Sequence, residues 1–355
     1  MKICDNHIHI EAGIPINDTV INIKRIIDEN NYDRMNILAL PTYHENGYSQ
    51  NYEVLYLKDK LSPKVYASVG WCHNFNCKDT ADYYLDVIKN FYSMGCDGVK
   101  IIEGKPDCYR KVGRKLNDKI YDKFFAFCEE KGIPVTMHLG DPATFWDWEK
   151  ATEIQKEKGW IYSKNDATLE QLRSEAFGVL KKFPKLKLIF AHFCFMSEEL
   201  ERAENLFEEY ENLYFDLTPG VEMYLNFSRN YDNSKEFFNK YADRILYGTD
   251  ASDDFSPESW TYSALNIVRP FMEGTEEYIN PDLGSSDILK PFGFGEDILQ
   301  KIYRENFIKL YGEIPRPLDY ELIAHSLSKF MKEFKLTDIE IKKLELIEGH
   351  FKNKR

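Results

Sequence analysis

Short apolar runs rich in β-branched and aromatic residues recur along the chain, each followed by a longer segment with helical spacing. Eight runs are strand candidates: KICDNHI from Lys2, NILAL from Asn36, VYASVG from Val65, GVKII from Gly98, PVTMHL from Pro134, KLIFAH from Lys187, LYFDL from Leu213 and ILYGT from Ile245. This alternation is typical of repeated βα units. Eight consecutive units favour a closed (β/α)8 TIM barrel over an open doubly wound sheet, which shows the same local pattern.

Several helix ends can be predicted from capping residues. The helix after the third strand is expected to begin near Asp79 and Thr80 and to stop at Gly95, and a later helix to stop at Gly132. Ser197 is expected to cap the helix after the sixth strand.

Two stretches are longer than a minimal barrel needs. They comprise residues 141–168 after strand five and residues 251–294 after strand eight. Both follow strand C-termini, where barrel enzymes place the loops that build their sites. The residues beyond Gly312 predict a helical C-terminal appendage. We therefore expect a barrel domain over residues 1–312 and a helical extension over residues 313–355 packed on it.

The composition is that of a folded protein with an acidic charge balance. Hydrophobic residues make up 43% of the chain and charged residues 30%, and the formal net charge is −13. This charge argues against nucleic acid or a membrane as the partner, because such anionic surfaces are bound by excess Lys and Arg. A small-molecule substrate is the expected partner.

The N-terminal sequence MKICDNHIHI lacks the long apolar run of a signal peptide, and no stretch approaches about 18 uninterrupted apolar residues. We therefore expect a cytoplasmic protein. The odd number of cysteines and the lack of a CxxC pair indicate neither a disulfide framework nor a thiolate zinc site, so reduced thiols are expected. The cysteines are Cys4, Cys72, Cys77, Cys96, Cys108, Cys128 and Cys194.

The first candidate for chemistry is a pair of histidines, His7 and His9, in the first strand candidate. Alternate side chains of a strand point to the same face, so the two imidazoles are placed to bind one cation. In a chain with 8 histidines, this spacing arises by chance in roughly one case in six, so the pair needs support from elsewhere.

That support comes from polar residues at the ends of later strand candidates. His138 lies near the end of PVTMHL, His192 ends KLIFAH, and Asp250 directly follows ILYGT. Because the C-terminal ends of barrel strands meet at one mouth, these side chains and the histidine pair are expected to converge there.

The arrangement resembles the amidohydrolase superfamily, in particular its amidohydrolase-related branch, which includes aminocarboxymuconate-semialdehyde decarboxylase. The resemblance covers about residues 1–312. It rests on Asp5-Asn6-His7-Ile8-His9, Met137-His138, Ala191-His192-Phe193, Tyr247-Gly248-Thr249-Asp250 and Lys301-Ile302-Tyr303-Arg304-Glu305-Asn306. The combination is specific, although each segment alone is not.

This resemblance implies a metal site and two catalytic residues. His7, His9, His138 and Asp250 would bind one divalent ion, with zinc as the expected metal, and three neutral imidazoles with a carboxylate suit that choice. Such an ion lowers the pKa of its water. Asp250 would accept a proton from the water, and His192 would orient the water or polarise a substrate oxygen.

Lys100, in the fourth strand candidate, has two interpretations. In binuclear relatives such as urease and the hydantoinases, a lysine in a similar context is carboxylated and bridges two metals, with His192 as a further ligand. Alternatively, Lys100 binds a substrate carboxylate or pairs with Glu103 or another acid. The branch resembled is usually mononuclear, which favours the second interpretation.

Four further residues are candidates for contacting substrate. His44 follows the second strand, His73 follows the third, Glu103 directly follows the fourth, and Trp146 belongs to an aromatic cluster in the long loop after the fifth. The histidines could equally be solvated loop residues, and the tryptophan could pack the insertion itself.

The sequence leaves three functions open. The first is a metal-dependent hydrolase that attacks an amide, ester or lactone with activated water. The second keeps the metal site but decarboxylates a small acid, as some members of the resembled branch do. The third is a barrel that binds a metal or ligand without catalysis. A homodimer is a further expectation, with the C-terminal appendage as a contact.

Overall fold

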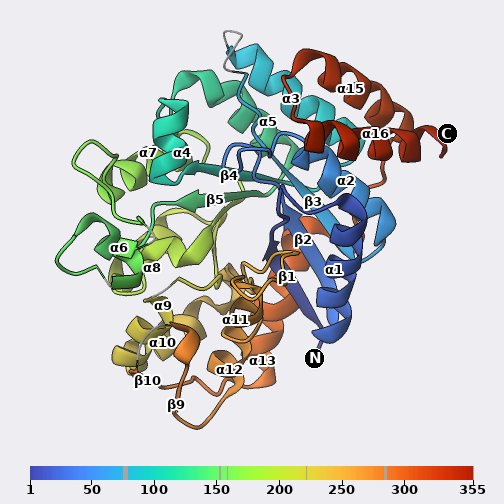
Figure 1. Cartoon of the computed structure of the whole chain (residues 1–355). Coiled ribbons are helices and arrows are strands. Elements are labelled where there is room, and N and C mark those ends of the chain that lie inside the picture. The colour runs from blue at the N-terminus through green and yellow to red at the C-terminus, as the bar shows by residue number, and fades with distance from the viewer. Residues whose placement is uncertain (75–78, 152, 158, 221, 284–285, 355) are drawn as a thin grey trace.

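Eight parallel strands follow one another in sequence order around a barrel, with helices on the outside (Figure 1). This computed structural model describes residues 1–74, 79–151, 153–157, 159–220, 222–283 and 286–354. The strands are β1 (Ile3–Ile8), β2 (Tyr32–Leu38), β3 (Val65–Gly70), β4 (Gly98–Gly104), β5 (Val135–Leu139), β6 (Leu188–Phe190), β7 (Leu213–Asp216) and β8 (Ile245–Leu246). The predicted (β/α)8 barrel is confirmed.

Backbone hydrogen bonds between the first and last strand segments close the barrel. The Asp250 N–H donates to the His7 carbonyl at 2.9 Å, and the His9 N–H donates to the Ala251 carbonyl at 2.9 Å. The closure therefore brings Asp250 beside the histidine pair through the backbone alone, before any side-chain contact is considered.

The helices between the strands begin and end largely where the capping residues predict. Thr80 caps the helix after β3, and Gly95 and Gly132 end helices with φ of 103° and 63°. The outer helices are α1 (Ile16–Glu29), α2 (Gln50–Lys60), α3 (Ala81–Met94), α4 (Pro106–Val112), α5 (Asp122–Lys131), α7 (Leu169–Lys182), α8 (Leu200–Glu209), α9 (Met223–Arg229), α10 (Tyr231–Tyr241), α13 (Glu296–Gln300) and α14 (Asn306–Tyr311).

The prediction for Ser197 is wrong. The N-cap of α8 is Glu199, and the Ser197 hydroxyl accepts a hydrogen bond from the Asn226 side chain at 3.0 Å instead. The helix starts later because the residues after β6 form a separate left-handed turn from His192 to Phe195.

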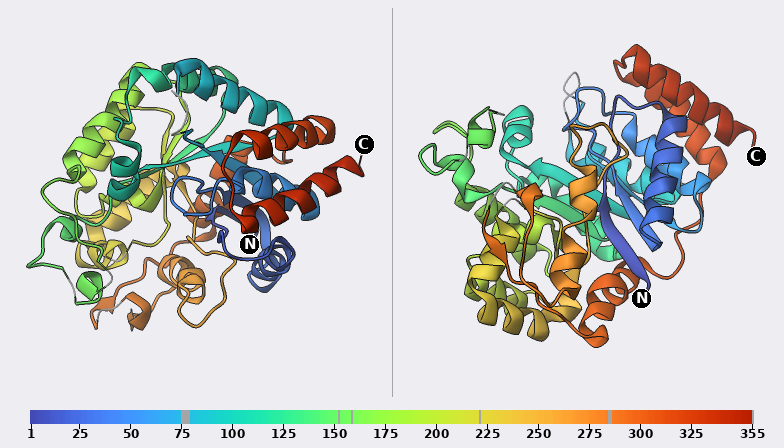
Figure 2. Two further views of the ribbon diagram at one scale, coloured as in Figure 1. Left: turned by 45° about the horizontal axis from the view of Figure 1, so that its top comes forward. Right: turned by 60° about the horizontal axis from the view of Figure 1, so that its bottom comes forward.

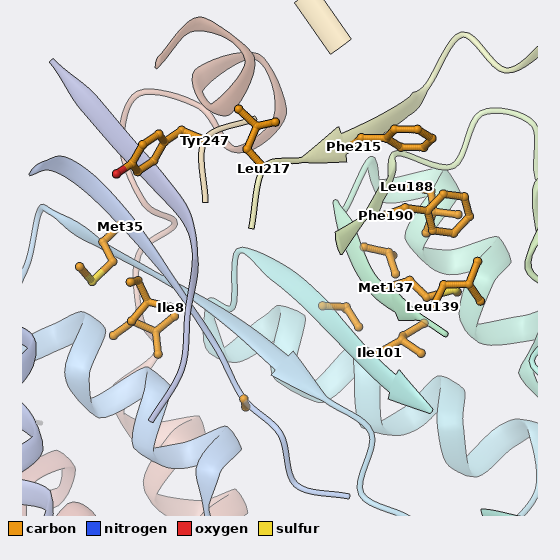
Figure 3. Packing of buried hydrophobic residues seen from close by; sticks show 14 of the residues in the cluster. Ile8, Met35, Ile101, Met137, Leu139, Leu188, Phe190, Phe215, Leu217 and Tyr247 are labelled. Atoms are coloured by element: carbon orange, nitrogen blue, oxygen red, sulfur yellow. The ribbon is translucent and has the colours of Figure 1, made fainter. Parts of the chain in front are cut away.

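An apolar layer lies between the strands and the surrounding helices. Ile8, Ile101, Met137 and Phe215 contribute to it from β1, β4, β5 and β7, and all four are fully buried (Figure 3). Successive side chains of a strand point to opposite faces. The sequence neighbours of these four residues therefore point into the barrel, where the candidate site lies.

The two long loops carry short elements of their own. After β5, the described parts include a 3-10 turn (Ala143–Trp146) and α6 (Glu153–Glu157); after β8, they include α11 (Thr261–Leu265), α12 (Val268–Glu273) and the paired strands β9 (Tyr278–Ile279) and β10 (Ile288–Leu289). Both loops leave C-terminal strand ends, as predicted.

The C-terminal appendage is a pair of helices, α15 (Tyr320–Glu333) and α16 (Asp338–Lys352), drawn in red in Figure 2. They pack against α3 and α2. The buried Lys343 ammonium donates to Glu53 at 3.0 Å and to the Ala12 carbonyl at 2.8 Å, so a charged contact joins α16 to the barrel. The division into two domains at residue 312 stays a prediction.

The cysteines of the described residues are buried free thiols, and Cys77 lies outside those residues. Within the part of the chain that the structure describes, no helix combines the length and apolar character needed to cross a membrane.

Gly248, directly after β8, generates a stability prediction. A Cβ at this position would lie 2.7 Å from the Thr218 hydroxyl and 3.0 Å from His7 Cβ. We expect Gly248→Ala to lower the free energy of unfolding by about 1–3 kcal/mol through overpacking, measured by urea denaturation. In the control Gly349→Ala on α16, the added Cβ meets no atom within 4 Å, and no loss is expected. Unchanged stability of Gly248→Ala would contradict the close approach.

Candidate metal centre

The predicted site residues converge at the C-terminal mouth of the barrel. His7 and His9 come from β1 and its end, Lys100 from β4 and His138 from β5, while His192 and Asp250 follow β6 and β8. All are buried except Asp250, whose side chain is 27% exposed. The side chains thus form a largely enclosed polar group inside the mouth of the barrel.

His7 lies at the centre of this group. Its Nδ1 lies 2.7 Å from Asp216 Oδ2, and its Nε2 lies 3.0 Å from both His9 Nε2 and Lys100 Nζ and 3.5 Å from Asp250 Oδ1. Burial, followed by the charge of Lys100, lowers the pKa of His7 well below its ordinary value. The ring is therefore neutral at physiological pH, with one N–H and one lone pair.

His9 is oriented by the backbone of the neighbouring strand. Its Nδ1 lies 2.9 Å from the Leu38 carbonyl oxygen, which can only accept a hydrogen bond. The Nδ1 atom therefore donates to this carbonyl, and Nε2 is the ring nitrogen that faces the site. That atom lies 3.3 Å from Asp250 Oδ1.

Asp216, at the end of β7, belongs to the site but is absent from the sequence-based set. Its carboxylate is fully buried, and Oδ1 accepts backbone hydrogen bonds from His192 at 2.9 Å and Thr218 at 3.2 Å. Burial raises its pKa, opposed by the charges of His192 and Lys100. Its position at a strand end is the signal that could have revealed it, as for His138.

Three potential ligand atoms, from His7, His192 and Asp250, all lie within 4.8 Å of one another. His192 adopts a left-handed conformation with φ of 53°, and its ring stacks on Phe195 with centroids 5.2 Å apart. Its buried Nδ1 has no hydrogen-bond partner among the described residues. Burial, followed by the charge of His138, lowers its pKa to about 4, so a neutral imidazole faces the site.

His138 lies beside this group. Its ring centroid is 4.7 Å from that of His192, but its Nε2 lies 2.8 Å from the Gly140 carbonyl and 3.5 Å from Asp141 Oδ1. Nε2 therefore donates to the carbonyl, which leaves Nδ1 as the atom with a lone pair. Its role as a ligand stays a prediction.

Lys100 is enclosed by the site rather than solvated. Burial lowers its pKa to about 8, opposed by the charges of Asp216, Asp250 and Glu103. The ammonium is thus a cation held among acceptors, and both the carboxylated and the substrate-binding interpretations stay open.

A second buried carboxylate, Asp5, lies on β1. Its Oδ2 accepts from the Thr249 hydroxyl at 2.7 Å, and its Oδ1 accepts from the His7 backbone N–H at 2.9 Å. These bonds tie β1 to Thr249, the residue before Asp250. Asp250 itself has a left-handed backbone, with φ of 63°. Burial raises the pKa of Asp5 to about 7.

Two of the four predicted substrate residues bind each other. His73 Nε2 lies 2.9 Å from Glu103 Oε1, which also accepts from Thr42 Oγ1 at 2.8 Å, and His73 Nδ1 lies 2.7 Å from the Tyr84 hydroxyl. Both residues are almost fully buried. Glu103 is therefore engaged by His73, rather than by Lys100 as one interpretation expected.

The other two predicted substrate residues differ in their surroundings. Trp146 packs within the insertion after β5: its indole N–H donates to the Ala167 carbonyl at 3.1 Å, and its ring lies 4.8 Å from that of Tyr162. His44 lies near the mouth, with Nδ1 3.9 Å from Glu11 Oε2 and with a pKa lowered by burial to about 4. Substrate contact by all four residues stays a prediction.

Solved structures with similar folds include an uncharacterized TIM-barrel protein from Bordetella bronchiseptica (TM-score 0.51, 14% identity, covering 87% of this chain and 98% of that one). Another is 2,6-dihydroxybenzoate decarboxylase from Rhizobium (TM-score 0.51, 13% identity, covering 88% of this chain and 98% of that one). A third is dihydroxybenzoic acid decarboxylase from Polaromonas with bound manganese (TM-score 0.51, 13% identity, covering 87% of this chain and 96% of that one). No curated protein matches the chain by sequence. The amidohydrolase family model matches residues 63–312. The chain therefore belongs to the amidohydrolase family, as the sequence motifs indicate.

Proposed function

We propose that this chain is a metal-dependent hydrolase that uses activated water on an amide, ester or lactone of a small molecule. One observation carries the proposal. His7 Nε2, His9 Nε2 and Asp250 Oδ1 face one another at 3.0, 3.3 and 3.5 Å. His7 uses Nδ1 toward Asp216 and His9 uses Nδ1 toward the Leu38 carbonyl, so both Nε2 atoms are turned toward the Asp250 carboxylate, and the Lys100 ammonium lies 3.0 Å from the His7 member.

Two imidazole nitrogens and a carboxylate oxygen gathered at such distances attract a cation, and a metal ion among them would contact all three atoms. Ligand atoms bound at 2.0–2.2 Å around a tetrahedral zinc ion are about 3.4 Å apart. The three observed separations lie close to that value. The donor set of two imidazoles and a carboxylate also suits zinc or a similar divalent ion.

His7, His9 and Asp250 would hold the ion, with His138 or His192 completing the set. When bound, a divalent cation would lower the pKa of a water molecule and would polarise a substrate oxygen. One ion is expected, and two if Lys100 is carboxylated. Zinc remains the proposed metal, since the manganese in the Polaromonas enzyme belongs to that protein.

The remaining chemistry falls to side chains at the mouth. Asp250, the one partly exposed acid of the group, would accept the proton of the attacking water. His192 presents an unpartnered Nδ1 that can orient the water or donate to a substrate oxygen once protonated. The Lys100 ammonium would balance negative charge that develops on the substrate.

Decarboxylation of a small carboxylic acid is the second candidate. The free Nδ1 of His192 could return a proton to carbon as well as to oxygen, and Lys100 places a cation near a substrate carboxylate. Two solved structures of similar fold are named as decarboxylases, which motivates the same test here.

Metal content gives the first test of the proposal. Purified protein should contain about one equivalent of a divalent metal. Removing the metal with a chelator should lower the free energy of unfolding by about 2.7 kcal/mol, relative to protein in free metal at a hundredfold excess over Kd. His9→Asn should lose the metal, whereas His325→Asn, at an exposed position on α15, should retain it. Less than about 0.1 equivalent, with stability unchanged by chelator, would contradict the proposal. A stoichiometry near two would favour a carboxylated Lys100.

Substrate class is tested with a panel of lactones, acyl amides and aromatic or enoic acids, assayed for hydrolysis and for carbon dioxide. The proposal expects hydrolysis, with kcat/KM about 10²–10⁴ lower in Asp250→Asn. Carbon dioxide release without hydrolysis would overturn the hydrolase in favour of the lyase. A metal-loaded protein inactive on the whole panel would favour the non-catalytic barrel.

A further inference from the structure

We infer that Asp216 is the positioning residue of the metal centre, because its carboxylate sets the tautomer of His7 and thereby decides whether Nε2 offers a lone pair. The inference rests on the proposed metal site. Asp216 Oδ2 lies 2.7 Å from His7 Nδ1, and both side chains are completely buried. No water reaches this contact to replace the carboxylate, and the Lys100 ammonium, 3.0 Å from Nε2, favours the same tautomer from the other side of the ring.

The other oxygen of Asp216 holds the carboxylate in that orientation. Oδ1 accepts from the backbone N–H groups of His192 and Thr218, at 2.9 and 3.2 Å. These fixed donors favour the ionised group and prevent it from rotating, so Oδ2 remains aimed at the imidazole. One carboxylate therefore links the β1 histidine to the turn that carries His192.

The chemistry of this contact requires an acid rather than an amide. A carboxylate can only accept from Nδ1, which leaves the lone pair on Nε2, facing His9 and Asp250. In Asp216→Asn, the amide oxygen can keep the two backbone bonds, which places the NH2 group against Nδ1. The amide would then donate to Nδ1 and drive the His7 proton to Nε2, into the position a metal would need.

Asp5 provides a matched control. It is also a fully buried acid that accepts backbone hydrogen bonds, but its contact with His7 is to the backbone N–H and not to the ring. Asp5→Asn therefore makes the same chemical change near the same residue without a hydrogen bond to the imidazole. A general effect of placing an amide at a buried acid would appear in both variants.

The test is nitrogen-15 NMR of histidine-labelled, metal-free protein, in which long-range proton–nitrogen correlations distinguish the tautomers. The His7 signals are assigned by their loss in His7→Gln. Wild type and Asp5→Asn should carry the proton on Nδ1, and Asp216→Asn should carry it on Nε2. A wild-type proton on Nε2, or an unchanged tautomer in folded Asp216→Asn, would overturn the inference. If Asp216→Asn does not fold, Lys100→Met decides: the proton should stay on Nδ1 because Asp216 holds it there, and its movement to Nε2 would assign the tautomer to the Lys100 ammonium and overturn the inference.

A zinc competition titration of the same proteins provides the second readout. Asp216→Asn should bind zinc about 10–100-fold more weakly than wild type, and the loss of affinity in Asp5→Asn should be smaller. Equal affinities of wild type and Asp216→Asn would overturn the inference. If the tautomer responds as expected but wild type binds no divalent metal, the proposed function fails and the role of Asp216 in setting the tautomer stands.

Discussion

The contact between His7 Nδ1 and Asp216 Oδ2 is the interaction on which the site depends. It joins β1 to β7 across the barrel interior at 2.7 Å, with both groups sealed from water. It holds the His7 proton on Nδ1, so that Nε2, the nitrogen that faces His9 and Asp250, offers a lone pair. Without it, the convergence of acceptor atoms that makes the site attractive to a cation would not follow from the positions of the residues.

The fold keeps strained backbone in place around that contact. Residues His192 to Phe195 form four consecutive positions with φ between 49° and 56°, and such a conformation costs roughly 1–2 kcal/mol for each residue other than glycine. Asp216 accepts the N–H of the first, and the next two side chains are fully buried. Asp5 also supports strained backbone: its carboxylate accepts from the Thr249 hydroxyl, next to the left-handed Asp250.

Much of the fold could be predicted because strand and helix periodicities are local properties of the chain. The convergence at the mouth followed from one rule, that barrel strands end at a common face, and this placed His7, His192 and Asp250 together. The same rule applied to LYFDL would have included Asp216. Residue type alone does not single out Asp216, because an acid at a strand end is more often solvated than buried.

Other features depend on tertiary contacts that local patterns do not encode. The left-handed turn after β6 displaced the helix start from Ser197 to Glu199. The pairing of His73 with Glu103 depends on the register of β3 and β4, and the packing of Trp146 depends on a loop with its own small core. Residue type and position in the sequence identify these side chains as candidates for the site, but they do not predict which groups the side chains contact.

X-ray absorption spectroscopy of the metal-loaded protein tests the central claim most directly, because it reports the atoms bound to the ion. A zinc-loaded sample should show nitrogen and oxygen ligands at about 2.0–2.2 Å, with outer-shell scattering from at least two imidazoles. Absence of this zinc signal in His9→Asn, loaded with zinc in the same way, would place the ion at the β1 pair. A sulfur shell near about 2.3 Å, or a spectrum without imidazole, would contradict the account.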